Sequence, residues 1–360
     1  MMRIVVAMSG GVDSSVAAAL LAEQGHDVIG LSMQLYPSTG SGQATAWEEP
    51  FGTCCTLDDL NDARRVADAI GIPHYILNFE RQFQDTVVSN FVREYAAGRT
   101  PLPCAHCNSD LKFSTLLDRA RGLGAEQVAT GHYARVEQSS TGRWLLRRSA
   151  DPAKDQSYFL FSLTQAQLAR AAFPVGALSK PEVRAQARRL GLKVAEKPDS
   201  QEICFVPDGD YAAFVARKAP EAVHAGAIVD RQGEVLGSHA GVHRFTVGQR
   251  KGLGVSGPAP LYVVKIEAES GQVTVGPREA LDRTALTASG TNWVAIDTPS
   301  DWLSVSAQIR HRHHAAPGRV RAIDSERAEF IFDQPQQAVT PGQAVVFYDG
   351  DLVIGGGWID

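Results

Sequence analysis

The chain has 360 residues, which is enough for two or three domains with a sizeable buried core. Its net charge of −5 excludes a generally basic nucleic-acid-binding protein, so a nucleic acid would have to be held by local patches. No apolar run reaches the length of a membrane span and no export signal opens the chain, which predicts a cytoplasmic protein with no membrane partner. Five cysteines, an odd number, argue against a disulfide framework and favour thiol chemistry or metal binding.

The first fifteen residues predict a strand, a glycine turn and a helix. Residues 4–8 form an apolar run rich in β-branched side chains, as in a strand buried on both faces of a parallel sheet. Ser9, Gly10 and Gly11 interrupt this run, and good helix formers follow as far as Gln24. This order directs backbone N–H groups and the positive end of a helix dipole to one point, which predicts a phosphate site.

The same turn carries hydroxyls and a carboxylate, from Ser9, Asp13, Ser14 and Ser15, which a purely structural turn does not need. The letters S-G-G-V-D-S match neither the P-loop nor the G-x-G-x-x-G pattern. They resemble the S-G-G-x-D-S signature of the PP-loop ATP pyrophosphatases, which split ATP between its α and β phosphates. Because Asp13 beside a pyrophosphate would be repelled without a cation between them, we expect ATP together with Mg²⁺.

Predicted strands and helices alternate through the first half of the chain, which indicates an α/β domain with a doubly wound parallel sheet. Further buried strands are expected at residues 27–33, 72–79 and 128–130. Between the first two of these lies a long irregular segment, 34–53, followed by Cys54 and Cys55. A helix capped by Thr56 and Asp59 comes next. Another helix is expected over 82–97, with buried side chains at a spacing of four: Phe83, Val87, Phe91 and Tyr95.

Cys104 and Cys107 form a C-x-x-C in a proline-rich segment. The prolines are expected to keep the approach extended, with a helix beginning after Asn108 or Ser109. Cys107 would then lie just before a helix N-terminus, where the dipole favours the thiolate. Three alternatives stay open for this pair of cysteines: a nucleophile, a redox pair, or metal ligands.

Gly131 and His132 follow the strand at 128–130, at the sheet edge where open α/β folds bind ligands. A hairpin is expected over residues 133–146. Further on, a helix capped by Ser179 and Glu182 carries cations on one face. These cations are expected to contact an RNA backbone: Lys180, Arg184 and Arg188.

The composition changes beyond Pro207 to short alternating strands and glycine turns. We therefore expect a catalytic domain over 1–206, a small β-rich central domain over 207–280 and a C-terminal β-barrel over 281–360. Residues 310–314, R-H-R-H-H, could be a zinc-binding histidine cluster, but the interleaved arginines favour RNA contact.

Motifs along the whole chain now support a family resemblance. They are S-G-G-V-D-S-S, C-C, P-x-x-C-N, T-G-H-Y-A-R, K-D-Q-S-Y-F-L, D-S-x-x-I-C-F, T-V-G-Q-R-K-G-L-G and P-G-Q-A-V-V-F-Y. In this order they resemble the bacterial tRNA-specific 2-thiouridylases. The resemblance implies ATP-dependent replacement of the 2-oxygen of a tRNA wobble uridine by sulfur, with AMP and pyrophosphate released. The implied partners are that tRNA and a protein sulfur donor, either a cysteine desulfurase or a sulfur relay protein.

The resemblance also implies roles for individual residues, and it assigns none as a dedicated metal ligand. Cys107 would be the nucleophile, Cys204 would carry the persulfide, and Asp13 would join them in catalysis. The implied ATP-binding residues are Ala7, Met8, Ser9, Gly10, Gly11, Val12, Asp13, Ser14, Met33 and Gly131. The implied tRNA-binding residues are His132, Lys154, Asp155, Gln156, Arg310, His311 and Gln343. Sulfur could pass by direct attack of the persulfide or through hydrosulfide released by Cys107, and both routes stay open.

One segment departs from the family pattern. Where the family often reads N-P-D, this chain has Leu102, Pro103 and Cys104, so neither an amide nor a carboxylate is available to approach the target base. Two other functions remain as alternatives. One is a different PP-loop adenylating synthetase or amidotransferase that acts without RNA. The other is an RNA-binding protein in which Cys104, Cys107 and Cys204 hold zinc or an iron–sulfur cluster.

Overall fold

The computed structural model describes residues 1–36, 57–199, 203–206, 208–257 and 259–360. Most of the irregular segment expected at 34–53, with Cys54, Cys55 and the cap at Thr56, lies outside these residues. The described chain divides into two units. The first contains Met1–Val87, Cys104–Gly209 and Asp351–Val353, and the second contains Val88–Pro103, Asp210–Gly350 and Ile354–Asp360.

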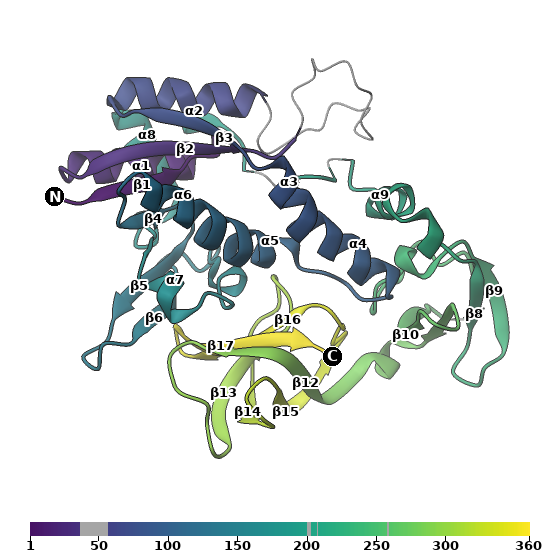
Figure 1. The fold of residues 1–360 in the computed structure, drawn as a ribbon. Helices are drawn as coiled ribbons and strands as arrows, with labels where there is room; N and C mark the ends of the chain where they lie inside the picture. Colours follow the sequence, from purple (N-terminus) through teal and green to yellow (C-terminus); the bar gives the residue numbers. More distant parts are fainter. Residues whose placement is uncertain (37–56, 200–202, 207, 258) are drawn as a thin grey trace. The chain divides into compact units, whose positions relative to one another are not determined.

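The first unit is built on a parallel sheet with the strand order β3-β2-β1-β4-β7 (Figure 1). Its strands are β1 (Arg3–Ala7), β2 (Asp27–Gln34), β3 (His74–Asn78), β4 (Gln127–Ala129) and β7 (Ala171–Ala172). The four strand pairs of this sheet are parallel, which confirms the expected sheet type. The strand order reverses direction at β1, so the carboxyl ends of β1 and β4 lie side by side at a switch point.

Helices cover both faces of this sheet (Figure 1). The helices on one face are α1 (Val12–Glu23), α2 (Leu57–Ile70) and α8 (Lys180–Arg189). Their apolar side chains, such as Val16, Ala63 and Val183, share one buried cluster with Ile4 and Val6 of β1. On the other face, α6 (Leu116–Gly122) contacts β4. The doubly wound architecture that the sequence predicts is therefore confirmed.

The chain is helical from Glu80 to Ala96, close to the expected range. This stretch consists of α3 (Glu80–Phe83), a π-helical segment (Gln84–Val88) and α4 (Ser89–Ala96). Its four side chains at a spacing of four, Phe83, Val87, Phe91 and Tyr95, are all buried, as predicted.

The helix that carries Cys107 begins earlier than the sequence predicts. It starts with α5 (Pro103–His106), continues as a π-helical segment (Cys107–Thr115) and ends with α6. Proline suits the first helical position because no intrahelical partner is needed there for its missing N–H. Cys107 therefore lies one turn inside the helix, where the dipole acts less strongly than at the terminus. Asn108 is buried, and its side-chain amide donates to the Phe159 carbonyl oxygen at 3.0 Å instead of capping a helix.

Two further local predictions are confirmed in the first unit. The hairpin consists of β5 (Ala134–Gln138) and β6 (Trp144–Arg148), which pair antiparallel. The Ser179 hydroxyl accepts from the Glu182 N–H, and the Glu182 side chain accepts from the Ser179 N–H, as in a capping box. Short helices complete this unit: Ser157–Phe159, α7 (Gln165–Leu168) and Lys193–Glu196.

The second unit contains a small mixed sheet and a barrel. The small sheet has the order β10-β11-β8-β9, with β8 (Gly226–Val229), β9 (Val235–His239), β10 (Tyr262–Glu267) and β11 (Gln272–Gly276). Helix α9 (Tyr211–Lys218) packs on α4, where the rings of Phe214 and Phe91 lie 6.0 Å apart. The predicted hairpin at 226–237 corresponds to β8 and β9.

The barrel strands follow the order β12-β15-β14-β13-β16-β17, and pairing of β12 with β17 closes the barrel. They are β12 (Asp282–Trp293), β13 (Leu303–Gln308), β14 (Ala316–Ala322), β15 (Ala328–Gln337), β16 (Ala344–Asp349) and β17 (Leu352–Ile359). The six strands of the barrel thus form a closed ring, and β6 pairs with β17 outside this ring. Stacked rings of Trp293, Phe330 and Phe347 are buried in the barrel domain. Within the described residues, no helix is both long enough and apolar enough to cross a membrane.

Candidate active site

The turn between β1 and α1 has the order of strand, glycine turn and helix N-terminus from which the sequence predicts an anion site. Helix α1 begins after Gly11, which has no side chain to cap its first N–H groups, so these groups suit an external anion. Gly10 has φ +73°, and a Cβ atom there would lie 2.1 Å from the Asp59 carbonyl oxygen of α2. Glycine is therefore required at this position by both backbone conformation and close packing.

The serines of the turn have separate tasks. The Ser14 hydroxyl accepts from the Ser9 N–H at 3.2 Å, and the Ser15 hydroxyl donates to the Gly11 carbonyl oxygen at 2.8 Å. Ser14 and Ser15 are buried, whereas Ser9 is exposed. The two buried hydroxyls therefore hold the shape of the turn, and Ser9 presents its side chain at the surface of the site.

Asp13, in the first turn of α1, is surrounded by donors from distant segments. Tyr133 donates its hydroxyl to Asp13 Oδ1 at 2.8 Å, and Lys180 Nζ lies 2.8 Å from Oδ1 and 2.9 Å from Oδ2. Lys180 thus supplies positive charge that the sequence argument ascribed to Mg²⁺. Gly131 lies against the same turn, because a Cβ atom on it would be 2.5 Å from the Ser14 nitrogen. The structure therefore brings the two predicted sheet-edge segments together.

The charged network extends from Asp13 through Lys180 to Asp199. Asp199 lies 2.7 Å from Lys180, 2.7 Å from Lys154 and 3.5 Å from Arg184. Burial alone would raise the pKa of Asp199, but the hydrogen bonds from Lys154 and Lys180 outweigh it and lower that pKa. For Tyr133, burial and the neighbouring Asp13 carboxylate both raise the pKa, so its hydroxyl stays protonated and donates.

The prediction that Lys180 and Arg184 face an RNA backbone is wrong. Lys180 is only 8% exposed and binds Asp13 and Asp199, while Arg184 donates to the carbonyl oxygens of Ala195 and Lys197. The helical spacing correctly placed them on one face of α8, but this face is covered by α1 and by the segment around Asp199. Arg188 is exposed and pairs with Glu196 at 2.7 Å.

Lys197 contacts the candidate site, and sequence reasoning did not place it there. Its Nζ donates to the Gly10 carbonyl oxygen at 3.1 Å, to Asp59 at 2.6 Å and to Asp62 at 2.7 Å. Burial would lower the pKa of Lys197, but the hydrogen bonds to the two aspartates raise it above its usual value. The only signal in the sequence was a lysine two residues before the D-S-x-x-I-C-F motif.

His132 lies at the sheet edge, as predicted, with its ring turned toward protein groups. Nδ1 lies 2.6 Å from the Thr130 hydroxyl, and the ring meets Phe173 edge-on at 6.0 Å. Burial, with a smaller effect from Lys112, holds the pKa of His132 well below its ordinary value. His132 is therefore neutral near pH 7, and it can exchange hydrogen bonds without carrying charge.

The residues of the triplet 154–156 have different surroundings. Lys154 reaches Asp199, as described above. The Asp155 carboxylate accepts from Arg148 at 2.7 Å and from the Ser149 N–H at 3.0 Å. The Gln156 side-chain oxygen accepts from the Tyr133 N–H at 2.9 Å. Asp155 and Gln156 thus fix the backbone around Lys154, whose side chain is 37% exposed.

The three described cysteines all belong to the first unit, where Cys104 is exposed and Cys107 and Cys204 are half-buried. Cys204 precedes Phe205, whose buried ring packs on Phe83 of α3 at 5.6 Å. The π-helical segment that begins with Cys107 also contacts α3. Both cysteine segments therefore flank the same short helix. Among the described side chains, no group of three His, Cys, Asp or Glu has the arrangement of a metal site.

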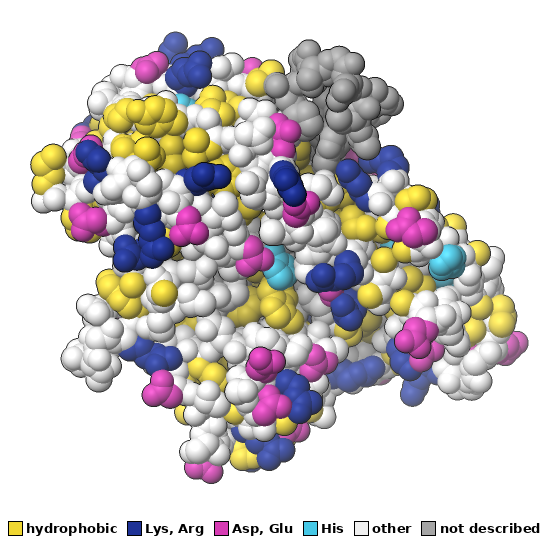
Figure 2. Space-filling view, in the orientation of Figure 1, with side chains coloured by type: hydrophobic (Ala, Val, Ile, Leu, Met, Phe, Trp, Pro, Cys, Tyr) yellow, Lys and Arg dark blue, Asp and Glu magenta, His cyan; other side chains and the backbone are white. Residues whose placement is uncertain are grey.

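The remaining predicted tRNA-binding residues lie in the second unit. Gln343 Nε2 donates to the carbonyl oxygens of Thr100 and Pro101 at 3.0 and 3.1 Å, so Gln343 holds the segment that leads into the Cys107 helix. Arg310 and His311 are exposed after the end of β13, and Arg310 also donates to the Gln337 carbonyl oxygen at 3.0 Å. Figure 2 shows lysine and arginine interspersed with acidic side chains on the visible face, in keeping with the net charge of −5.

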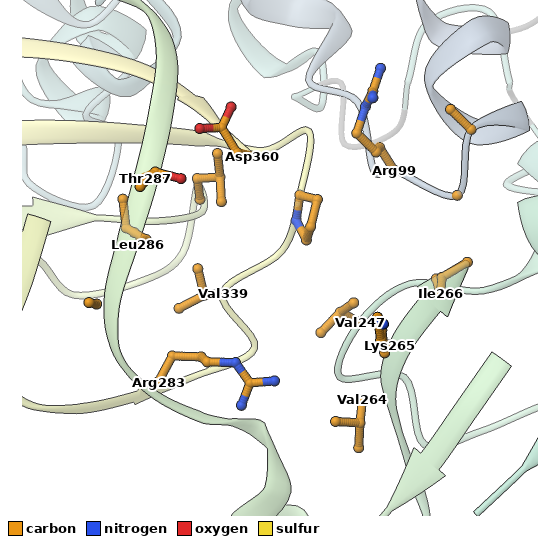
Figure 3. Close-up of a pocket in the computed structure, with 15 residues that line it drawn as sticks. Arg99, Val247, Val264, Lys265, Ile266, Arg283, Leu286, Thr287, Val339 and Asp360 are labelled. Carbon is orange, nitrogen blue, oxygen red and sulfur yellow. The ribbon is translucent and has the colours of Figure 1, made fainter. Parts of the chain in front are cut away.

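The second unit also contains a cavity of about 390 Å³ (Figure 3). Its walls are largely apolar, from side chains such as Val247, Val264 and Leu286, with Arg99 and Lys265 among them. These two cations have acidic partners, because Arg99 binds Glu94 at 2.6 Å and Lys265 binds Glu267 at 2.5 Å. A third cation in the lining, Arg283, donates to the carbonyl oxygens of Ala280 and Asp282, and Asp360 also lines the cavity. The cavity includes none of the predicted site residues.

Three family models match the chain in succession. The first, described as tRNA methyl transferase HUP domain, matches residues 2–208. The second, tRNA methyl transferase PRC-barrel domain, matches 212–277, and the third, Aminomethyltransferase beta-barrel domain, matches 283–359. Together they follow the order of parallel sheet, small β domain and barrel seen in the structure.

Relatives with known names are similar over nearly the whole chain. A protein from Geotalea uraniireducens, named tRNA-specific 2-thiouridylase MnmA, is 57% identical over 359 residues, which cover 99% of this chain and 95% of the relative. Proteins of the same name from Geobacter metallireducens and Solibacter usitatus are 56% and 54% identical, covering 99% of this chain and 96% and 99% of theirs. Two of the family descriptions mention methyl transfer, but identity above 50% over the full length makes the relatives' names the more specific guide.

Proposed function

Because the chain belongs to the family of tRNA-specific 2-thiouridylases, we propose that it replaces the 2-oxygen of a tRNA wobble uridine by sulfur at the expense of ATP. The single observation that carries this proposal is 57% identity to a protein of that name over 99% of the chain. The turn after β1 supports the use of ATP, and the two cysteine segments beside α3 support sulfur transfer.

ATP is proposed to place its phosphates at the N-terminus of α1. The turn offers backbone N–H groups and the positive end of the helix dipole, and Lys180 adds a cation beside Asp13. The residues proposed to surround the nucleotide are Ala7, Met8, Ser9, Gly10, Gly11, Val12, Asp13, Ser14, Met33 and Gly131. We also propose that the chain is organised as three domains, over residues 1–206, 207–280 and 281–360.

The residues at the site also fit a magnesium ion. The Asp13 carboxylate has about four acceptor positions. Tyr133 and Lys180 use three of these positions, so one remains for Mg²⁺ or a water bound to it. When bound, Mg²⁺ would neutralise charge on the departing pyrophosphate. The protein's own groups at this point, the α1 N–H groups and Lys180, stabilise the same charge.

The chemical sequence begins with attack of the uracil 2-oxygen on the α-phosphorus of ATP, which forms an adenylated uridine and releases pyrophosphate. Sulfur then replaces the adenylated oxygen at C2, and AMP leaves with the bonding electron pair. Cys204 is proposed to bring that sulfur as a persulfide, loaded by a cysteine desulfurase or a sulfur relay protein. The persulfide sulfur could attack C2 directly, or Cys107 could first release it as hydrosulfide. In both routes Cys107 and Cys204 end in a disulfide with each other, and an external thiol reductant restores both thiols.

The tRNA is proposed to contact exposed groups of both units. Lys154, Arg310 and His311 offer donors to phosphates. Asp155, Gln156 and Gln343 use their side chains on protein backbone or protein side chains, so we propose that they position neighbouring segments for the RNA. His132, neutral at the sheet edge, would place the target uridine after it leaves the anticodon stack.

Mass spectrometry of nucleosides tests this function. Unmodified tRNA is incubated with the protein, ATP, Mg²⁺ and sulfide, and 2-thiouridine is expected together with one AMP per modified base. When a protein persulfide donor replaces sulfide, Cys107→Ser and Cys204→Ser should each abolish the product, because one thiol carries the sulfur and the other takes the Cys204 sulfur into a disulfide. With free sulfide neither thiol is needed for that exchange, so both variants should still form the product. Release of ADP in place of AMP, or full activity of Cys107→Ser with the persulfide donor, would contradict the proposal.

A further inference from the structure

Asp199 lies between two lysines that serve different parts of the proposed site. Lys180 Nζ is 2.7 Å from Asp199, and the same nitrogen is 2.8 Å from Asp13 in the first turn of α1. Lys154 Nζ is also 2.7 Å from Asp199, and Lys154 belongs to the segment proposed to contact tRNA. One carboxylate therefore holds a cation beside the ATP phosphates and a cation assigned to RNA.

We propose that Asp199 is a placeholder counter-ion, which occupies Lys180 and Lys154 until the phosphates of ATP and of tRNA take its place. This inference rests on the proposed function, because it assumes that both anions bind in the first unit. It makes Asp199 a positioning residue, because Asp199 contacts neither ATP nor tRNA but sets the availability of the two lysines that are proposed to contact them.

The burial of Lys180 explains why a placeholder is needed. Lys180 is only 8% exposed, and a buried ammonium without a counter-charge is strongly unfavourable. Asp13 and Asp199 together compensate it in the ligand-free protein. A phosphate bound at the N-terminus of α1 arrives beside Asp13, so it comes within reach of the same nitrogen and can replace Asp199.

Arg184 explains why Asp199 can release both lysines. Its guanidinium donates to the backbone carbonyls of Ala195 and Lys197, so it stays in place when ligands bind. One of its nitrogens is 3.5 Å from Asp199, which is long for a hydrogen bond and close enough to shorten into one. Asp199 therefore keeps a cationic partner after both lysines have moved to phosphates.

The arrangement predicts that ATP and tRNA weaken each other's binding through Asp199. Once Lys180 binds an ATP phosphate, Lys154 is the only lysine that still pairs with Asp199, and this ion pair becomes stronger. A tRNA phosphate must break the stronger pair in order to bind Lys154, so its affinity falls. Thermodynamic linkage requires the same factor in the reverse direction. Removal of the Asp199 charge should therefore tighten binding of each ligand, whereas loss of a merely structural residue would weaken both.

Binding measurements on the protein with Asp199→Asn test whether loss of this charge tightens or weakens the binding of each ligand. The probes are magnesium α,β-methylene-ATP, by calorimetry, and an unmodified tRNA transcript, by fluorescence anisotropy. We expect each ligand alone to bind about five-fold more tightly than to the wild type, and the mutual weakening to shrink by a similar factor. The matched control is Glu196→Gln, which removes the same charge three residues earlier from an exposed pair with Arg188 and should leave both affinities nearly unchanged.

Lys154→Met, measured without RNA, provides a second and independent test. In this variant Lys180 is the only one of the two lysines that still pairs with Asp199, so their ion pair becomes stronger. The ATP analogue should therefore bind more weakly, although Lys154 is not proposed to contact it. This variant decides the question if Asp199→Asn does not fold. Weaker or unchanged binding of both ligands to Asp199→Asn, or unchanged analogue affinity in Lys154→Met, would overturn the inference. Failure of the wild type to bind either ligand would instead contradict the proposed function.

Discussion

Lys197 donates a hydrogen bond to the carbonyl oxygen of Gly10 at 3.1 Å, across a separation of 187 residues in the sequence. The same ammonium group binds Asp59 and Asp62 of α2. It therefore ties the anion-binding turn, the helix that packs against it and the segment leading to Cys204 into one structure. The contact explains why α2 approaches Gly10 so closely that no side chain fits there.

Lys197→Met should destabilise the first unit by about 1–3 kcal/mol, because it leaves the buried Asp59 carboxylate without this ammonium partner. Urea denaturation measures the change in the free energy of unfolding. Lys193→Met, at an exposed position four residues earlier, serves as the control and should change stability by less than about 0.5 kcal/mol. Equal stability of the two variants would show that the Lys197 contacts contribute nothing.

Gly10→Ala should weaken binding of the ATP analogue at least about ten-fold, since the new methyl group must displace either the turn or α2. Gly25→Ala is the matched control: Gly25 has φ +80°, similar to the +73° of Gly10, but nothing lies within 4 Å of its would-be Cβ. Gly25→Ala should cost stability without changing nucleotide affinity. Calorimetric titration of both variants separates backbone strain from the steric effect at the site.

Stability should fall as the pH decreases below about 6.5, the ordinary pKa of histidine. His243 is 1% exposed, and among the described residues no group hydrogen-bonds to either of its ring nitrogens. Burial lowers the pKa of His243, so the unfolded chain takes up a proton more readily than the folded one. Its stabilisation is therefore complete above pH 6.5 and is lost as the pH falls toward the lowered folded-state pKa.

His243→Leu should reduce the loss of stability between pH 7 and pH 5, measured as the shift in thermal midpoint. His224→Gln, at an exposed position in the same unit, should leave that pH dependence as it is in the wild type. A wild-type-like pH profile for His243→Leu would assign the acid sensitivity to other groups. Burial also lowers the pKa of His313 and of His239. Part of the loss of stability at low pH should therefore remain in His243→Leu.

Gln343→Ala should lower the free energy of local opening of the segment that precedes the Cys107 helix by about 1–2 kcal/mol. The reason is the loss of two hydrogen bonds to the Thr100 and Pro101 carbonyls. The Thr100 amide, which donates to the Pro341 carbonyl oxygen at 2.8 Å, is a local probe of this opening by hydrogen exchange. Gln343→Glu should exchange at least as fast, since a carboxylate repels the same carbonyl oxygens. Unchanged exchange at Thr100 would mean that Gln343 does not hold this segment.

The sequence alone determined the features that depend on local pattern. The opening strand, the glycine turn and α1 were readable because β-branched residues, a glycine pair and helix formers follow one another within 24 positions. The buried face of the helix at Glu80 to Ala96 and the capping box at Ser179 and Glu182 were also correct, since they involve residues three or four apart. The sheet type followed from the alternation of such elements.

Only the tertiary structure decided which side chains surround the turn between β1 and α1. Spacing placed Lys180 and Arg184 on one face of a helix, but it could not show that Asp13, 167 residues away from Lys180, would cover this face. Nor could it show that the Cys107 helix begins at Pro103, because proline is compatible both with an extended approach and with a first helical position. Ion pairs between distant segments depend on how the chain folds back on itself, and no local pattern encodes their partners.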